Sequence, residues 1–240
     1  MDSFSRTELL VGREAMERLR RCRVAVFGIG GVGGSAAEAL ARCGVGAIDL
    51  FDSDRVSLTN LNRQVIALHS TLGRLKVDVM AERLLDIHPD LRVEKHALFY
   101  LPENADTVDL TPFDYVVDAV DTVAAKLELI QRCQRLGVPI LSAMGAGNRL
   151  DPGRLKIGDV YETSVCRLAR VMRRELRKRG VTRLTVAYST EEPLEIPPER
   201  AAALAEEGNT RRAVPGSVAF VPPAMGMLMA SRVIRDLIAR

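Results

Sequence analysis

The sequence has few of the residues that mark disulfide-stapled or zinc-stapled proteins. Its 240 residues include four cysteines and no tryptophan. The cysteines form no Cys-x-x-Cys pair and lie far apart, at Cys22, Cys43, Cys133 and Cys166. This spacing argues against a zinc ribbon or a disulfide framework and suits a reducing compartment.

Long apolar runs are absent as well. Residues 1–6 lack an apolar stretch of signal-peptide length, and no segment is long and apolar enough to span a bilayer. We therefore expect a cytoplasmic protein. The net charge of +3 is mild, so the composition alone gives no reason to expect a polyanionic partner. The hydrophobic content of 47% is ample for a sizeable core.

A glycine-rich stretch organises the chain. An apolar run at 24–27 leads into glycines and then into alanine, glutamate and leucine, which predicts a strand, a tight turn and a helix. Gly28 allows the turn, and Gly30 and Gly31 let backbone N–H groups approach a phosphate. Gly33 permits close packing of the helix on the strand. A glycine loop that is only a turn is the alternative.

A second apolar strand strengthens the nucleotide interpretation. It covers 47–51 and ends in Asp52. In nucleotide-binding folds a carboxylate that accepts hydrogen bonds from a ribose stands about twenty residues beyond the glycines. The alternative role for Asp52 is a turn or a helix cap.

Strand patterns alternate with helical patterns over the first 150 residues. Further strands are expected at 92–98, 115–121 and 139–143, and helices at 8–21, 71–87 and 123–136. Thr122 is a candidate cap for the last of these helices, and Gly137 ends it. This alternation predicts an α/β fold with a doubly wound, mostly parallel, Rossmann-like sheet. Ligands of such sheets bind beyond the carboxyl ends of the strands.

The regular alternation of strands and helices ends after Gly147, which predicts a C-terminal extension of mixed strands and helices. Strands are expected at 155–160, 184–189 and 217–221, a helix at 164–179 and a mobile surface loop at 191–214. Pro222 and Pro223 begin a last helix that ends at Arg240, and its small residues, among them Gly226, predict close packing. We expect one domain over 1–240, with a nucleotide-binding core at 1–150 and the extension at 151–240.

Charged side chains lie between the second strand and the fourth. Arg63 and Lys76 suit a triphosphate, which carries more charge than the pyrophosphate of a dinucleotide. Asp121 suits magnesium, which prefers a carboxylate together with phosphate oxygens. The alternatives are solvated surface charges for Arg63 and Lys76, and a helix cap for Asp121.

These motifs together resemble the ThiF-type adenylating domain of the ubiquitin-activating-enzyme superfamily. The resemblance implies that Asp52 binds the ribose of ATP and that Asp121 binds magnesium. It implies a larger set of ATP-binding residues, which is Gly28, Gly30, Gly31, Gly33, Asp52, Asp54, Asn60, Arg63, Gln64, Lys76 and Asp121. It also implies a homodimer in which Arg6 reaches into the partner subunit's site.

Within the superfamily, the whole chain is similar to the tRNA threonylcarbamoyladenosine dehydratase branch. The segments that carry this likeness are 4–10, 67–71, 142–148, 163–166, 215–217 and 220–222. The likeness implies adenylation of the threonyl carboxylate of threonylcarbamoyladenosine in tRNA, then intramolecular ring closure that expels AMP. Arg63, Lys76 and Asp121 are then the catalytic residues. A monovalent cation near the site and a sulfurtransferase partner stay open.

The chain departs from the branch at two positions. Gly34 stands where the family usually has serine, so a hydroxyl contact to phosphate there is in doubt. Arg167 follows Cys166 where the family often has proline. We do not expect Cys166 to be a nucleophile, because the ring closure needs no covalent enzyme intermediate and buried cysteines are common.

A basic helix is the candidate tRNA contact. Apolar residues at helical spacing alternate with cations, which are Arg167, Arg170, Arg173, Arg174, Arg177, Lys178 and Arg179. Such a face suits RNA phosphates, and Glu175 alone opposes it. A merely solvated face is the alternative.

Two other functions are considered. Adenylation of the C-terminus of a ubiquitin-like sulfur carrier would use the same cleft, but the absence of Cys-x-x-Cys pairs and the basic helix argue against it. An NAD-binding module would leave Arg63, Lys76 and Asp121 unexplained.

Overall fold

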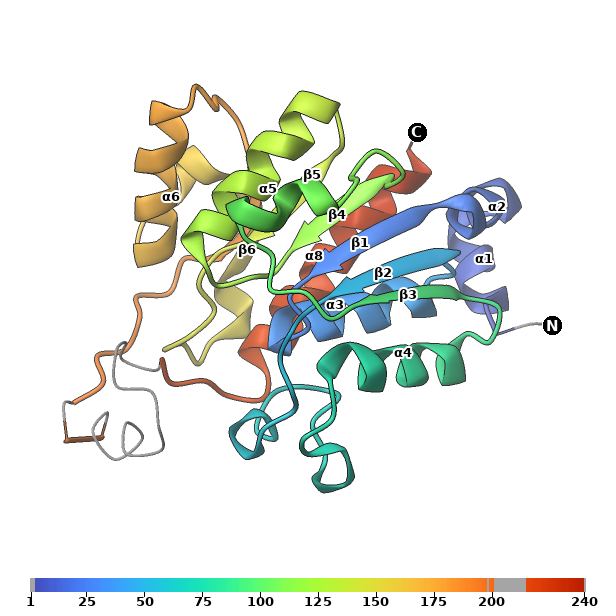
Figure 1. Ribbon diagram of the computed structural model, residues 1–240, viewed down its shortest axis with the longest axis horizontal. Coiled ribbons are helices and arrows are strands. Elements are labelled where there is room, and N and C mark those ends of the chain that lie inside the picture. The colour runs from blue at the N-terminus through green and yellow to red at the C-terminus, as the bar shows by residue number, and fades with distance from the viewer. Residues whose placement is uncertain (1–2, 198, 201–214, 240) are drawn as a thin grey trace.

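The structure is a computed structural model that describes residues 3–197, 199–200 and 215–239. These residues form an α/β fold around one seven-stranded sheet in the order β3-β2-β1-β4-β5-β7-β6 (Figure 1). The strands are β1 Arg23–Phe27, β2 Ala47–Phe51, β3 Arg92–His96, β4 Tyr115–Asp118, β5 Ile140–Ala143, β6 Leu155–Asp159 and β7 Thr185–Ser189. All neighbouring strands are parallel except β6, which pairs antiparallel with β7. The predicted doubly wound, mostly parallel sheet is confirmed.

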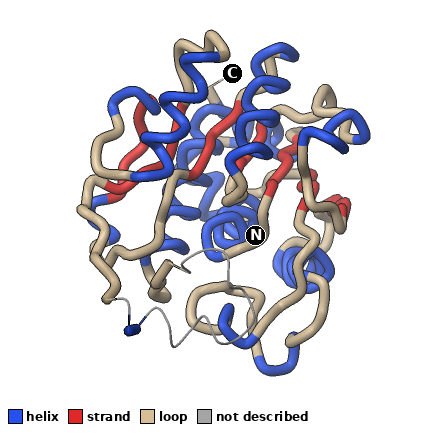
Figure 2. The backbone as a smooth tube through the Cα atoms, turned by 60° about the vertical axis from the view of Figure 1, so that its left-hand side comes forward, coloured by secondary structure: helices blue, strands red, loops and turns tan. Residues whose placement is uncertain are grey.

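Helices cover both faces of the sheet. They are α1 Ser5–Val11, α2 Arg13–Arg21, α3 Gly31–Arg42, α4 Lys76–Ile87, α5 Val123–Leu136, α6 Arg167–Lys178 and α8 Val221–Ile238. In the view of Figure 1, α5 and α6 lie in front of the sheet, and α3 and α8 lie behind it. Figure 2 shows the strands enclosed between these helical layers.

The alternation of β1 explains the two layers. Val24 and Val26 point into the cluster that contains the apolar side chains of α3, α4 and α8. Ala25 and Phe27 point into the opposite cluster, together with side chains of α5. Side chains of a strand alternate between the faces of a sheet, so the apolar residues 24–27 of β1 are buried on both sides.

The last helix packs closely on the helix that follows the glycine loop. A Cβ atom at Gly226 of α8 would lie 2.2 Å from the carbonyl oxygen of Val32 and 2.9 Å from the nitrogen of Ala36, both in α3. Ala230 is buried one turn further along. The predicted close packing of this helix is confirmed.

Several predicted boundaries are corrected by the structure. The helix expected at 71–87 begins at Lys76, because residues 69–71 form a separate 3₁₀ turn and Gly73 has a φ of +79°. The strand expected over 115–121 ends at Asp118, so Asp121 lies on a loop. Thr122 holds the cap position of α5, but its hydroxyl does not cap the helix.

The strand predicted at 217–221 is wrong. Residues 215–220 have no strand structure, and α8 begins at Val221. The carbonyl of Ser217 accepts a hydrogen bond from Nδ2 of Asn62 at 3.0 Å instead of a bond from a neighbouring strand. The two prolines that follow lack an N–H and favour the first turn of a helix. Most of the loop predicted at 191–214 lies outside the described residues.

No helix in the described ranges combines the length and the apolar character needed to cross a bilayer.

Candidate functional site

A cleft of about 300 Å³ lies beyond the carboxyl ends of β1, β2 and β4. Strand β1 stands between β2 and β4, so the strand order reverses here: β2 and β3 lie on one side of β1, and β4 and β5 on the other. Doubly wound sheets bind their ligands at such a reversal. The cleft brings together most of the predicted ATP-binding residues, which are Gly28, Gly30, Gly31, Asp52, Asp54, Asn60, Arg63, Gln64, Lys76 and Asp121. Gly33 does not line it.

The glycine loop is fixed by close backbone contacts. Gly28 has a φ of +87°, and a Cβ atom on it would lie 2.7 Å from the carbonyl oxygen of Ala119. A Cβ atom on Gly33 would lie 1.8 Å from the carbonyl oxygen of Gly28, so this glycine serves packing. Helix α3 begins at Gly31, and the first N–H groups of a helix have no partner within it. The loop and the helix start therefore present backbone donors to an anion.

Asp52 ties the loop to the end of β2. One carboxylate oxygen accepts a hydrogen bond from the backbone N–H of Ile29 at 2.7 Å. The other accepts from the N–H of Asp54 at 2.8 Å. A carboxylate has further lone pairs, so these bonds leave acceptor capacity for a ribose hydroxyl.

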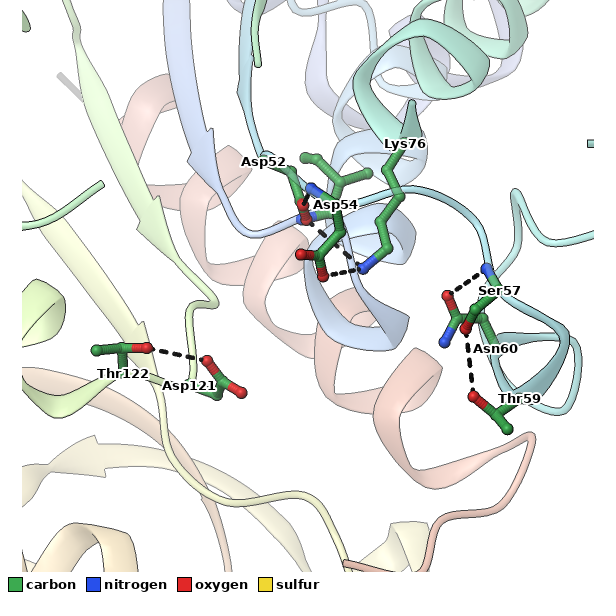
Figure 3. Close-up of polar contacts among 9 residues, drawn as sticks. Asp52, Asp54, Ser57, Thr59, Asn60, Lys76, Asp121 and Thr122 are labelled. Carbon is green, nitrogen blue, oxygen red and sulfur yellow. Dashed lines mark hydrogen bonds and ion pairs between the residues drawn. The ribbon is translucent and has the colours of Figure 1, made fainter. Parts of the chain in front are cut away.

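Lys76 enters the cleft from the first residue of α4 (Figure 3). Its side chain is only 7% exposed, and its Nζ lies 2.7 Å from Oδ2 of Asp54 and 4.0 Å from Oδ2 of Asp52. Asp54 itself is largely exposed, with 64% of its side-chain surface accessible. The ammonium is therefore held at the cleft by an acid that water can solvate.

The loop before α4 supplies Asn60, Arg63 and Gln64. Oδ1 of Asn60 accepts a hydrogen bond from the N–H of Ser57 at 3.1 Å, which is drawn in Figure 3. Nη1 of Arg63 donates to the carbonyl of Thr59 at 3.1 Å. Burial lowers the pKa of Arg63, and no carboxylate of the described chain forms an ion pair with it. Oε1 of the buried Gln64 has no hydrogen-bond partner within the described ranges.

Asp121 stands across the cleft from Lys76 (Figure 3). Its side chain is exposed, and its Oδ1 accepts a hydrogen bond from the hydroxyl of Thr122 at 3.3 Å. The described residues contain no group of three or more acidic, histidine or cysteine side chains that could hold a metal. A magnesium ion at Asp121 would therefore depend on oxygens of a bound phosphate, which suits the preference of this ion.

A buried ion pair that the sequence did not predict lies beneath the turn of Asp121. The side chains of Asp118 and Lys126 are both 0% exposed, and Nζ of Lys126 lies 3.0 Å from Oδ2 of Asp118. The hydroxyl of Ser142 donates to the same carboxylate. The other oxygen, Oδ1, accepts from the N–H of Val120 at 3.2 Å. The pair thus holds the turn between β4 and α5. The sequence signal that could have revealed this pair was Lys126, a lysine at an inward-facing position of the helix predicted at 123–136.

The sequence analysis also did not predict the aromatic side chains that line one side of the cleft. Phe27 and Phe51 stack with their ring centroids 4.1 Å apart, and His96 stacks on Phe51 at 4.1 Å. Tyr100 lines the cleft with a buried hydroxyl that has no hydrogen-bond partner in the part of the chain that the structure describes, and burial raises its pKa. Its unpaired hydroxyl and the apolar surface around it suit a nucleobase.

The basic helix is less open than its sequence indicates. Arg173 turns inward and donates to the carbonyl of Thr163 at 2.7 Å. Three cations converge on Glu175, which are Arg174 at 3.1 Å, Lys178 at 3.0 Å and Arg179 at 2.9 Å. Hydrogen bonds from Lys178 and then Arg179 lower the pKa of Glu175 to about 2.

The remaining cations of this helix differ in their contacts. The guanidinium of Arg177 lies 5.1 Å from the ring centroid of Tyr161. Arg167 and Arg170 are exposed, and neither forms a hydrogen bond or an ion pair with another side chain of the described chain. Arg6 is exposed on α1 and does not line the cleft of its own subunit.

The fold and the cleft define a Rossmann-like α/β protein of the nucleotide-binding class. The chain belongs to the ThiF family, whose sequence model matches residues 4–240.

The chain is similar to several named members of this family. The chain is 43% identical over 242 residues to the tRNA threonylcarbamoyladenosine dehydratase of Bacillus subtilis, covering 99% of this chain and 95% of that protein. It is 41% identical to the protein of the same name from Escherichia coli over 174 residues, or 72% of this chain and 65% of that one. The crystal structure of the E. coli enzyme in complex with ATP superposes with a TM-score of 0.85 and 33% identity, covering 99% and 94% of the two chains.

Proposed function

We propose that this protein is an ATP-dependent dehydratase of threonylcarbamoyladenosine beside the tRNA anticodon. The threonyl carboxylate attacks the α-phosphorus of ATP, and pyrophosphate leaves. The neighbouring carbamoyl group then attacks the activated carboxyl carbon, closes the ring and expels AMP. The net change in the nucleoside is the loss of one water molecule.

The cleft supports distinct roles for its residues. The glycine loop and the start of α3 would bind phosphate oxygens through backbone N–H groups. Arg63 and Lys76 would neutralise the phosphates, and Asp52 would accept hydrogen bonds from the ribose. Catalysis of this type depends mainly on positioning and charge stabilisation. The protein needs no nucleophile, and Cys166 lies outside this cleft.

Asp121 would hold magnesium together with phosphate oxygens. The ion would supply further positive charge at the reacting phosphate. Because Asp121 is exposed on a turn that the Asp118–Lys126 pair fixes from beneath, its carboxylate is positioned without being used in another ion pair.

The wider setting of the enzyme is also proposed. One ThiF-type domain spans 1–240, with a nucleotide-binding core at 1–150 and an extension at 151–240. Arg6 would complete the site of a partner subunit in a homodimer, since it is exposed and does not line its own cleft. A cytoplasmic location is part of the proposal and is supported by the tRNA substrate.

The convergence of the glycine loop, Asp52, Arg63, Lys76 and Asp121 on one cleft carries this proposal. Adenylation of a ubiquitin-like sulfur carrier remains the second candidate, since it would use the same cleft. The missing Cys-x-x-Cys pairs and the cations of α6 favour the RNA substrate.

Two experiments test the proposal. Mass spectrometry of tRNA nucleosides from cells with and without this chain should show a difference of one water in threonylcarbamoyladenosine. The purified protein should release AMP and pyrophosphate only with tRNA that carries this nucleoside. Pyrophosphate exchange driven by a sulfur-carrier C-terminus and not by the tRNA would contradict the proposal.

A further inference from the structure

A second cleft, of about 550 Å³, opens beside the first along the same edge of the sheet. It is bordered by the loop that follows β5 and by the first residues of α6. Residues 193–196 and Pro215 complete it. It shares no lining residue with the first cleft. Because β5 is the neighbour of β4, the second cleft lies next to the turn that carries Asp121.

Arg149 lines this cleft with a buried guanidinium. The residue is 4% exposed, and its Nη1 donates to the carbonyls of Gly145 at 3.0 Å and Gly147 at 2.9 Å. Its Nε donates to the carbonyl of Glu191 at 3.3 Å. Its Nη2 has no hydrogen-bond partner, and within the described ranges no carboxylate pairs with it. A buried cation without a counter-charge is costly, so the position suits an anionic ligand.

The start of α6 adds positive potential at the same place. A Cβ atom on Gly145 would lie 3.5 Å from Sγ of Cys166 and 3.9 Å from Nη1 of Arg149, so the loop packs directly on the helix start. Cys166 is the cap residue of this twelve-residue helix, whose N-terminus carries a partial positive charge. The exposed Arg167 follows it and lines the cleft. Glu195 supplies the one carboxylate among the described lining residues, and it is exposed.

Asn148, the residue before Arg149, also lines the cleft and carries an acceptor. Its backbone is in the left-handed region with a φ of 57°, and its buried Oδ1 has no hydrogen-bond partner among the described residues. A guanidinium matches the oxygens of a phosphodiester, and an amide oxygen can accept from a ribose 2′-hydroxyl. Two neighbouring lining residues therefore carry the kinds of group that could bind the phosphate and the ribose of an RNA backbone.

We infer that the second cleft binds a phosphodiester of the RNA substrate through Arg149 and Arg167, with Asn148 accepting from the adjoining ribose. The RNA would enter along α6, whose exposed Arg170 continues the basic surface from Arg167. The identity of the RNA rests on the proposed function. The site itself rests on the unpaired guanidinium.

A carboxylate placed in the cleft gives the sharpest test. Leu194 lines it and is 47% exposed, so Leu194→Glu puts a negative charge beside the two arginines at a position that tolerates polar side chains. Leu194→Gln is the matched neutral control. We expect Leu194→Glu to weaken binding of an unmodified tRNA transcript at least about tenfold, because charge-assisted hydrogen bonds to phosphate are lost. The affinity for ATP, measured by calorimetry, should be unchanged in both variants.

Arginine variants give the second measurement. Arg149→Gln and Arg167→Gln should each raise the KM for modified tRNA and leave that for ATP unchanged. Arg92→Gln, an exposed arginine on the distant edge strand β3, is the control. Arg149→Gln and Arg167→Gln should each reduce the slope of log tRNA affinity against log salt by about 0.7 to 0.9, the value for one phosphate contact, and Arg92→Gln should leave it unchanged.

The outcomes separate the two proposals. A wild-type protein that does not dehydrate modified tRNA contradicts the proposed function. Normal dehydration together with unchanged tRNA affinity in Leu194→Glu overturns the second-cleft site alone. Equal loss of ATP and tRNA affinity in Leu194→Glu also overturns it, since the change would then act on the first cleft.

Discussion

The two sides of the first cleft hold their charged groups in different ways. On the side of β2 and α4, Lys76 and Asp54 form an ion pair at the surface of the cleft, with the acid largely exposed. On the side of β4, Asp121 stands in the cleft and forms no ion pair with the described residues, on a turn fixed by the fully buried pair of Asp118 and Lys126.

This difference separates a pair that can exchange partners from one that cannot. Water solvates Asp54, so Lys76 can move from it to a phosphate at little cost. Asp118 has no water to replace Lys126, so that pair must stay closed for the turn to keep its shape. One side therefore supplies an adaptable cation and the other supplies a fixed acid.

The largest effect is expected from removing the fixed acid. Asp121→Ala should lower kcat by a factor on the order of 10² or more, because the carboxylate that would hold magnesium at the reacting phosphate is lost. The fold should persist, since the side chain is exposed. AMP release with modified tRNA measures the effect, and Thr122→Val, which removes the hydroxyl bonded to Asp121, is the control. Turnover that survives in Asp121→Ala would end the proposed role of this residue.

Replacing Lys126 and replacing Lys76 should have different effects on the free energy of unfolding. Lys126→Met leaves Asp118 buried without a counter-charge and should cost about 3 to 5 kcal/mol of unfolding free energy. Lys76→Met leaves Asp54 in contact with water and should cost about 1 kcal/mol or less, while turnover falls. Urea denaturation of both variants tests this. Equal losses of stability would show that the two pairs are alike after all.

The adjacent glycines Gly33 and Gly34 of α3 should respond in opposite ways to substitution by alanine. Gly33→Ala forces a Cβ atom to 1.8 Å from the carbonyl of Gly28 and should cost about 1 to 3 kcal/mol. Gly34→Ala meets nothing closer than 3.6 Å, a methyl carbon of Val65, and should stabilise the helix by about 0.5 to 1 kcal/mol. Thermal unfolding of the two variants measures the loss of stability in the first and the gain in the second. Two losses of similar size would contradict the packing role assigned to Gly33 alone.

The smallest effect is expected at the exposed ion cluster of α6. The pKa of Glu175 lies near 2 in the folded chain, against an ordinary value of 4.5. A lowered folded pKa stabilises the protein above the unfolded value and loses that contribution as the pH falls from about 4.5 towards 2. Glu175→Gln should therefore differ slightly from wild type at pH 7 and converge with it near pH 2, as followed by urea unfolding. A difference that persists unchanged at low pH would exclude the cluster as its cause.

The sequence revealed those parts of the site that depend on local chemistry. Gly28 is needed for a positive φ and Asp52 follows a buried strand, and both requirements are visible in a window of a few residues. Lys126 was not found, because its partner Asp118 comes from the neighbouring strand and the pair exists only once α5 packs on the sheet. Tyr100 joins the cleft for the same reason, since its position depends on the path of the chain after β3.

Errors arose where one tertiary contact overrode a local pattern. The largely apolar run at 217–221 resembles a strand, but residues 215–220 form no strand, and α8 begins at Val221 with Pro222 and Pro223 in its first turn. The inward turn of Arg173 towards Thr163 could not be read from helical spacing, which made the whole face of α6 look open to RNA.

The close approach of α8 to α3 bears on the order in which a newly made chain matures. The glycine loop leads into α3, which is encoded early, but α8, which packs on α3 through Gly226, is synthesised after every other described element. Until α8 emerges from the ribosome, the apolar flank of α3 has no cover, and such surfaces invite association with other chains. The proposed ATP site should therefore become competent late in translation, although the glycine loop itself is made early.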